Sequence, residues 1–282
     1  MGSRTLSGPI QLQGLGLHSG LPCQVELRPG RDGVCFTSLS DPGAPPIRAR
    51  VDAVTDTRLA TTLRGAGRSI QTVEHLLSGV MGLQLDHLEI AVDGPELPVL
   101  DGTAGPWVKA IRTAGLVALA QPRQLLVVDK TVRVQAGSSW MEARPSGGLQ
   151  LQVDIDFDHP LIGAQHLDWT LTEGAFEAEL AWARTFGFEA DVARLQQLGL
   201  IAGGSLDNAV VFSERGVLNP GGLRQADEPV RHKAMDMLGD LALIGQPVQG
   251  CFVAHRPGHS LVIELVRALL ADPDAWHHET AP

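Results

Sequence analysis

Two stretches of the chain show the spacing of helices that bury one face. In residues 231–240, apolar residues recur at every third position from Met235 to Leu241, and no proline interrupts the run. This spacing is typical of an amphipathic helix. Residues 72–83 present a broad apolar face and begin with Thr72, a residue type that favours helix N-caps. We therefore predict helices over both stretches.

Short apolar or alternating segments, bounded by glycine, proline and aspartate, predict strands before and after these two helices. The expected strands are 10–13, 24–28, 34–37, 87–92, 125–134, 140–144, 149–157, 169–172, 209–212, 248–255 and 260–265, the last two forming a hairpin through a turn at 256–259. Further helices are expected at 104–114, 174–182 and 188–198, and the segment after Ala271 is expected to be loose.

The two halves of the chain share one order of predicted elements. Each has early strands, then a helix with a histidine near its start, then a strand. Residues 121–123 separate an alanine-rich segment from a new apolar run, and we place a domain boundary there. We therefore expect an α+β fold made of two similar α+β domains packed face to face. The first covers 1–121 and the second 122–271, followed by a loose tail at 272–282.

Composition limits the classes of function. The 282 residues carry a formal net charge of −10, which disfavours binding to nucleic acid. There is no signal-peptide core and no run of about 18 apolar residues, so we expect a cytoplasmic protein without stable membrane insertion. The three cysteines are widely spaced, and we interpret them as reduced thiols. A metal site in this chain must therefore use histidines and carboxylates.

Both predicted helices carry candidate metal ligands. His232 and Asp236 are four residues apart, so they project from one helix face, where zinc accepts both ligand types. An ordinary His/Asp pair on a solvated face is the alternative. Glu74 and His75 occupy the first turn of the other helix, where one could bind a metal and the other act as a base. Alternatively, Glu74 only complements the helix dipole.

If the two helix starts meet, the candidates form one constellation. His75, His232 and Asp236 supply three ligands and leave a fourth position for water, which is the layout of a catalytic zinc site. Glu74 could then take a proton from that water. The remaining candidates are Thr185 for a developing oxyanion, His259 as a protonated acid held charged by Asp240, Lys233 and Arg256 for phosphates or other anions, and Phe186 and Phe188 as a pocket wall.

A set of motifs resembles the UDP-3-O-acyl-N-acetylglucosamine deacetylase family. The motifs occur in the family's order and span roughly residues 5–265. They are GLHSG at 16–20, VEHL at 73–76, DFDHP at 156–160, ARTFGF at 183–188, GGSLDN at 203–208, VLN at 217–219, RHK at 231–233 continuing through Asp236 to GDL at 239–241, and GH at 258–259.

The resemblance implies a fold, a reaction and a role for each candidate. It implies helices sandwiched between two β-sheets, and zinc-dependent removal of acetate from UDP-3-O-(3-hydroxyacyl)-N-acetylglucosamine, the committed step of lipid A biosynthesis. The implied roles are zinc ligands for His75, His232 and Asp236, general base for Glu74, general acid for His259 paired with Asp240, oxyanion stabilisation for Thr185, diphosphate contacts for Lys233 and Arg256, and a uridine or sugar pocket for Phe186 and Phe188.

Several interpretations stay open at this point. The acyl chain is expected in an apolar passage formed around 186–201, and the only partner expected for a monomeric enzyme is its UDP-linked acylated amino sugar. Arg256 stands where the family often has lysine, and residues 56–62 carry alanine and threonine where some relatives have cysteine. His18 is either a site residue or a polar group beside a turn. A zinc deacetylase of another N-acetyl sugar and a non-catalytic nucleotide-sugar binding module are the alternative functions.

Overall fold

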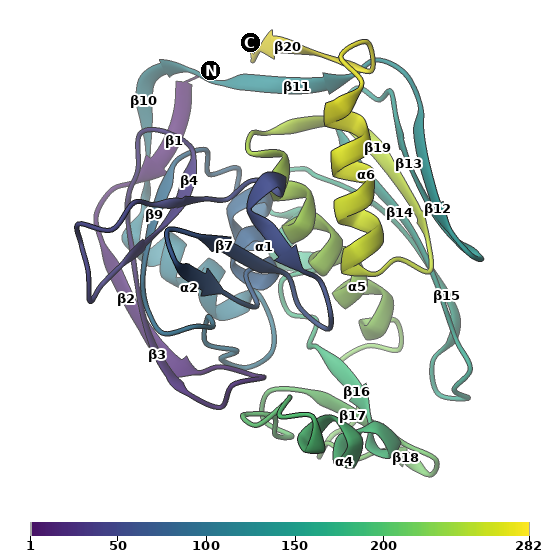
Figure 1. Ribbon diagram of the computed structural model, residues 1–282. Helices are drawn as coiled ribbons and strands as arrows, with labels where there is room; N and C mark the ends of the chain where they lie inside the picture. The colour runs from purple at the N-terminus through teal and green to yellow at the C-terminus, as the bar shows by residue number, and fades with distance from the viewer. Residues whose placement is uncertain (1, 282) are drawn as a thin grey trace.

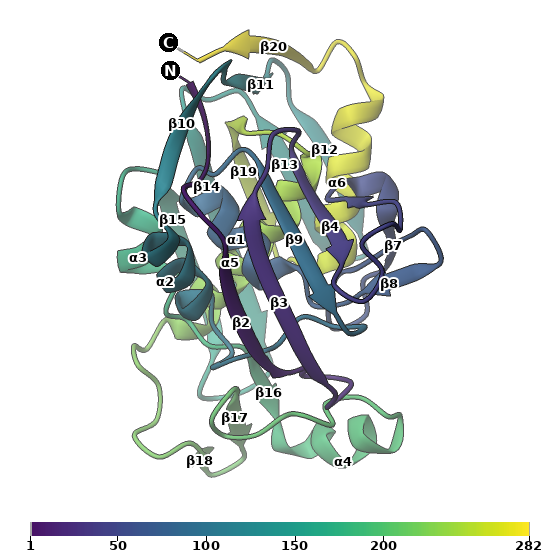
Figure 2. The ribbon, with the colours of Figure 1, turned by 90° about the vertical axis from the view of Figure 1, so that its left-hand side faces the viewer.

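Two β-sheets enclose a layer of helices in this computed structural model, which describes residues 2–281 (Figure 1). The first sheet has the order β2-β3-β9-β4-β5. Its strands are β2 (Ile10–Leu15), β3 (Pro22–Pro29), β4 (Val34–Ser38), β5 (Ile47–Arg48) and β9 (Leu88–Asp93). Figure 2 shows this sheet from its outer side, with the helices behind it. The sequence-based prediction of an α+β fold is confirmed.

The second sheet lies on the other side of the helices. Five of its strands follow the order β12-β13-β19-β14-β15, and β11 and β20 continue it beside the start of β19. The strands are β11 (Gln124–Val128), β12 (Val132–Ala136), β13 (Ser139–Arg144), β14 (Leu149–Phe157), β15 (Gly163–Thr170), β19 (Val248–His255) and β20 (Trp276–Thr280). The single strand predicted at 125–134 is therefore two strands, β11 and β12.

The internal repeat is visible in the topology of the two sheets. The central strand of each, β9 or β19, is antiparallel to one neighbour, β3 or β13. It is parallel to the other neighbour, β4 or β14. Both outer pairs of each sheet are antiparallel. The two halves therefore repeat one strand order with one set of directions. The exact boundary at 121–123 stays a prediction.

Each repeat contributes two helices to the layer between the sheets. These are α1 (Glu74–Gly82) and α2 (Gly105–Ala114) from the first half, and α5 (Glu228–Leu241) and α6 (His259–Ala271) from the second. Helix α1 packs against α5. A Cβ atom on Gly239 of α5 would lie 2.0 Å from the carbonyl oxygen of Glu74. Glycine at 239 therefore lets the start of α1 touch the backbone of α5.

A small sheet is inserted at the same point of each repeat, between the strand β5 or β15 and the first central helix, α1 or α5. In the first half it is β6-β7-β8, built from β6 (Val54–Asp56), β7 (Thr62–Gly65) and β8 (Arg68–Ile70) after the 3₁₀ turn Val51–Ala53. In the second half it is β16-β17-β18, built from β16 (Phe186–Phe188), β17 (Val210–Ser213) and β18 (Gly216–Val217), and α4 (Glu189–Gln197) packs against it. The short helix α3 (Ala175–Glu179) precedes this insert in sequence and contacts α1. Figure 1 shows the second insert and α4 at the end of the molecule opposite the termini.

The two ends of the chain lie side by side and are paired into sheets. Strand β1 (Gly2–Leu6) pairs with β10 (Leu116–Pro122), and β20 pairs with β11. The prediction of a loose tail at 272–282 is therefore wrong for 276–280, which form an edge strand. No helix within residues 2–281 has the length and apolar character needed to cross a membrane.

Two further predictions of local structure are corrected. The segment 260–265 was expected to be a strand, but it lies in helix α6, whose buried side chains Leu261, Leu265 and Leu269 recur every four residues. Thr72 was expected to cap α1, but Val73 holds the N-cap position. Thr72 has a positive φ of 60°, and its hydroxyl donates to the buried carboxylate of Glu96 at 2.9 Å.

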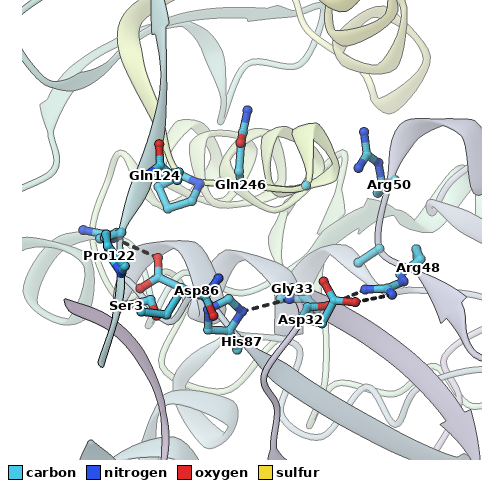
Figure 3. Close-up of a pocket in the computed structure, with 16 residues that line it drawn as sticks. Ser3, Asp32, Gly33, Arg48, Arg50, Asp86, His87, Pro122, Gln124 and Gln246 are labelled. Atoms are coloured by element: carbon cyan, nitrogen blue, oxygen red, sulfur yellow. Dashed lines mark hydrogen bonds and ion pairs between the residues drawn. The ribbon is translucent and has the colours of Figure 1, made fainter. Parts of the chain in front are cut away.

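A cavity of about 500 Å³ lies between the halves near the N-terminal strand (Figure 3). Charged groups on its wall pair with one another: Arg48 with Asp32 at 2.5 Å, and Arg123 with Asp86 at 2.8 Å. None of the candidate site residues from the sequence lines it. The candidate site residues lie instead where α1 and α5 meet.

Candidate metal centre and catalytic site

The contact between α1 and α5 brings together the three side chains predicted as metal ligands. The Nε2 atoms of His75 and His232 lie 3.5 and 3.4 Å from the same oxygen, Oδ1 of Asp236. All three side chains are buried. The solvated-face alternative for His232 and Asp236 is therefore wrong, because the helix face that carries them is covered by α1.

The spacing of these atoms fits a tetrahedral metal ion. Nitrogen and oxygen ligands about 2.0–2.1 Å from zinc lie roughly 3.3–3.4 Å from one another in a tetrahedron. The Oδ1 atom of Asp236 is buried and has no hydrogen-bond partner among the described residues. A buried acceptor facing two imidazole nitrogens needs a cation to compensate it. The residues present therefore fit a divalent metal with two histidines and one carboxylate.

Neighbouring groups orient two of these ligands. The Nδ1 atom of His232 lies 3.1 Å from the carbonyl oxygen of Ala183, so Nδ1 donates and Nε2 keeps its lone pair for a metal. Burial lowers the pKa of His232 to about 4, which keeps the ring neutral. The Nζ of Lys233 donates to Oδ2 of Asp236 at 3.2 Å and leaves Oδ1 free. Although burial opposes it, His232 and Lys233 hold the pKa of Asp236 well below its usual value.

Glu74 stands beside the ligand His75 in the first turn of α1. Its side chain is 2 % exposed, so it does not merely complement the helix dipole from the surface. The carboxylate accepts a hydrogen bond from the backbone N–H of Thr61 at 3.1 Å, and its other oxygen lies 3.8 Å from Nε2 of His259. Burial raises the pKa of Glu74 to about 7, while His259 and His75 pull it down. A carboxylate in this range can accept a proton near neutral pH.

His259 faces Glu74 from the first turn of α6. It was predicted near a hairpin turn, whereas it is the first residue of a helix. Its Nδ1 donates to Oδ2 of Asp240 at 2.7 Å. Burial alone would lower the pKa of His259, but Asp240, Glu74 and Asp236 outweigh it and raise the pKa to about 9. The ring is therefore cationic at neutral pH, with Nε2–H directed toward Glu74.

Thr61 belongs to this group although the sequence pattern does not mark it. It lies just before β7 in the first insert and is fully buried. Its hydroxyl donates to Oδ1 of Asp240 at 2.6 Å, across 179 positions of sequence. In the sequence, its place in the short segment 56–62 could have drawn attention to Thr61. Nothing in the spacing of that segment, however, points to Asp240.

The second insert begins directly beside the ligands. Thr185 is half-buried, and its N–H donates to the carbonyl of Gly102 at 2.8 Å. The ring of Phe186 meets His232 edge to face, with centroids 6.1 Å apart, and Phe188 packs near Phe186 at 6.4 Å. Phe186 therefore lies next to His232, and the role of the two rings as a pocket wall stays a prediction. The role of Thr185 at an oxyanion stays a prediction.

The predicted anion-binding residues and His18 lie in different surroundings. Lys233 is half-buried and lies 5.9 Å from the centre of the Phe186 ring, beside the candidate ligands. Arg256 is exposed and adopts a positive φ of 52° at the end of β19. His18 lies in the turn 17–19 but is buried, and its backbone N–H donates to Glu96; its role stays open. Burial lowers the pKa of His18.

Comparison of the sequence with known proteins shows the family of the chain. A sequence model of the family described as UDP-3-O-acyl N-acetylglycosamine deacetylase matches residues 3–271. The chain belongs to this family. A UDP-3-O-acyl-N-acetylglucosamine deacetylase of Myxococcus xanthus is 43% identical over 277 residues, covering 97% of this chain and 88% of the relative. Proteins of the same name from Brucella melitensis biotype 2 and Brucella ovis are each 42% identical over 276 residues, with 97% and 96% coverage.

The match to the deacetylase family covers most of the architecture. The matched segment includes the first sheet, both inserts and every strand of the second sheet except β20, and it ends at the last residue of α6. The buried His/His/Asp group and the facing Glu74 and His259 therefore lie inside the part of the chain that the family model describes.

Proposed function

We propose that this chain is a zinc-dependent amidohydrolase that removes acetate from UDP-3-O-(3-hydroxyacyl)-N-acetylglucosamine, the committed step of lipid A biosynthesis. One observation carries the proposal. A buried ligand triangle of His75, His232 and Asp236 lies next to a carboxylate and an imidazolium that face each other at 3.8 Å. Amide hydrolysis needs a base for the attacking water and an acid for the leaving amine, and these two groups supply them.

The proposed mechanism assigns one proton transfer to each group. Zinc held by the three ligands would supply Lewis-acid polarisation and would lower the pKa of water. The carboxylate of Glu74 takes a proton from the attacking water. The Nε2–H of His259 then gives its proton to the leaving nitrogen, so that the amine departs uncharged. Asp240 bonds Nδ1 of His259 and stabilises the cationic ring until that transfer.

The other candidates are proposed to bind the substrate. The Thr185 hydroxyl would donate to the oxyanion of the tetrahedral intermediate. Lys233 and Arg256 would contact the diphosphate, and Phe186 and Phe188 would line the uridine or sugar pocket. The acyl chain would follow the second insert over residues 186–201, where α4 has no buried side chain of its own and Leu198 is 65% exposed. We further propose a cytoplasmic monomer that uses no nucleic-acid partner.

The substrate preference separates this proposal from its alternatives. The test measures acetate release from the acylated UDP-sugar and from UDP-N-acetylglucosamine without the acyl chain, with Glu74→Ala as the inactive control. We expect turnover of the acylated substrate alone. Turnover confined to another N-acetyl sugar would support the deacetylase of different specificity. Binding of the UDP-sugar with no acetate release from any substrate would support the binding module and overturn the proposal.

A further inference from the structure

Thr61 contacts both halves of the proposed proton-transfer machinery. Its backbone N–H donates to Glu74, and its hydroxyl donates to Asp240, which in turn bonds His259. These contacts form a ring of four residues, because Nε2 of His259 lies 3.8 Å from Oε1 of Glu74. A single buried residue of the first insert therefore joins the carboxylate of α1 to the carboxylate of α5.

We propose that Thr61 is a positioning residue that fixes the relative placement of the base Glu74 and the acid His259. This inference rests on the proposed function, because it assigns Thr61 to the same reaction. Thr61 transfers no proton itself, and its contacts are with the carboxylates of Glu74 and Asp240. It acts through Asp240 on one side and through the carboxylate of Glu74 on the other.

The hydroxyl determines which way the Asp240 carboxylate faces. Asp240 is 1% exposed, and its two oxygens have separate donors: Thr61 on Oδ1 and His259 on Oδ2. The bond at 2.6 Å is a charge-assisted hydrogen bond from a hydroxyl to a carboxylate, a strong type. Without that donor, Oδ1 would be a buried acceptor with no partner, and the carboxylate could rotate to share His259 between both oxygens.

The backbone contact keeps the base in place independently of the side chain. The N–H of Thr61 reaches Oε2 of Glu74, and the carbonyl of Thr61 accepts a long hydrogen bond of 3.5 Å from Val73, next to Glu74. A substitution at 61 that retains the backbone therefore removes only the contact to Asp240. The backbone and side-chain contributions of Thr61 can therefore be separated by the choice of substitution at position 61.

The test compares Thr61→Val, which removes the hydroxyl at nearly constant volume, with Thr61→Ser, which keeps it. The matched control is Thr62→Val, because Thr62 is the half-buried neighbour whose hydroxyl has no hydrogen-bond partner among residues 2–281. For Thr61→Val we expect kcat to fall about 10-fold with KM unchanged, as for other groups that orient a catalytic side chain. Thr61→Ser should restore most of kcat, and Thr62→Val should match the wild type.

A double-mutant cycle shows whether the hydroxyl acts through Asp240. In an Asp240→Ala background, Thr61→Val should cause no further loss of kcat, because the acceptor is already gone. A further 10-fold loss there, a wild-type kcat in Thr61→Val, or an equal loss in Thr61→Ser would each overturn the proposal. Melting temperature and zinc content are measured for every variant, and Thr61→Ala replaces Thr61→Val if the latter does not fold.

A readout without substrate separates this inference from the proposed function. The proton on Nδ1 of His259 gives an NMR resonance that reports its hydrogen bond to Asp240. We expect this resonance to shift or broaden in Thr61→Val and to stay near its wild-type position in Thr61→Ser and Thr62→Val. If the wild type released no acetate, the proposed function would fail. An unchanged resonance in Thr61→Val would overturn the role of Thr61 whichever substrate the enzyme uses.

Discussion

At the scale of single residues, the proposed reaction requires that Glu74 is deprotonated while His259, 3.8 Å away, is protonated. Burial raises the pKa of Glu74 to about 7, and nearby carboxylates raise the pKa of His259 to about 9. At a pH between these two pKa values, the carboxylate of Glu74 is deprotonated and the imidazole of His259 is protonated. A metal cation held by His75, His232 and Asp236 would lower the pKa of Glu74 from this raised value, because positive charge favours the carboxylate.

We expect a bell-shaped dependence of kcat/KM on pH. The acid limb belongs to Glu74, which is active only when deprotonated, and it should lie below pH 7 in the metal-loaded enzyme. The basic limb belongs to His259, which is active only when protonated, so activity should fall as pH rises through about 9. Initial rates from pH 5 to 10 check this. A basic limb that survives in His259→Gln would show that another group is the acid.

We expect Glu74→Ala to keep its zinc and lose most of its turnover, on the order of 10²-fold or more, as when a general base is removed. The metal should remain because the ligand triangle does not include Glu74. Zinc content and kcat are measured on the same preparation. Turnover close to that of the wild type would remove Glu74 from its role as base.

At the scale of elements, the site depends on how closely α1 approaches α5. The backbone of Gly239 reaches the carbonyl of Glu74, and the ligands Asp236 and His232 lie about one and two turns before it on α5. Any side chain at 239 would push the two helices apart. The distances between His75 and Asp236, and between Glu74 and His259, would then increase together.

We expect Gly239→Ala to lower stability by about 1–3 kcal/mol, the usual cost of overpacking a close contact. Activity should fall as well, because the added Cβ would lie 2.0 Å from the Glu74 carbonyl oxygen. Gly79→Ala in α1 is the matched control, since its Cβ would meet its nearest neighbour at 3.7 Å and alanine favours a helix interior. Thermal melts of both variants test this. Equal stability of the two would contradict the close contact.

The elements that the sequence predicted best are those with long periodic patterns. Helices α1 and α5 follow from their apolar spacing, and most strands of the two sheets, though not β5 or β20, follow from short apolar runs. The run 261–265 was misassigned because its four apolar residues suit a strand as well as a helix, and the helical period becomes clear only when Val266 and Leu269 are included. Strand β20 could not be predicted, because its exposed His277, His278 and Glu279 carry no strand pattern and pair only with β11.

At the scale of the whole molecule, the site lies where two repeats of one topology meet. The sequence predicted the repeat from the order of elements, and the candidate ligands from a histidine near the start of each central helix. The contact between Thr61 and Asp240 could not be predicted, because it joins an insert of one half to a helix of the other across 179 positions. Only the packing of the halves brings them together.

We expect the C-terminal strand to contribute to stability but not to catalysis. Removal of residues 276–282 would expose the edge of β11, which pairs with β20 from Gln124 to Val128. Each kcal/mol lost should lower the melting temperature by roughly 2–4 °C in a chain of this size. Zinc content and kcat should stay at wild-type values. A large loss of either would mean that β11 and β20 support the site itself.

The most direct test of the central claim measures bound zinc and acetate release together, in the wild type and in His232→Ala. His166→Ala is the control, because His166 is an exposed histidine on β15. We expect one zinc per chain and turnover of the acylated UDP-sugar in the wild type and the control, and loss of both in His232→Ala. Full zinc content and full turnover in His232→Ala would contradict the metal centre proposed between α1 and α5.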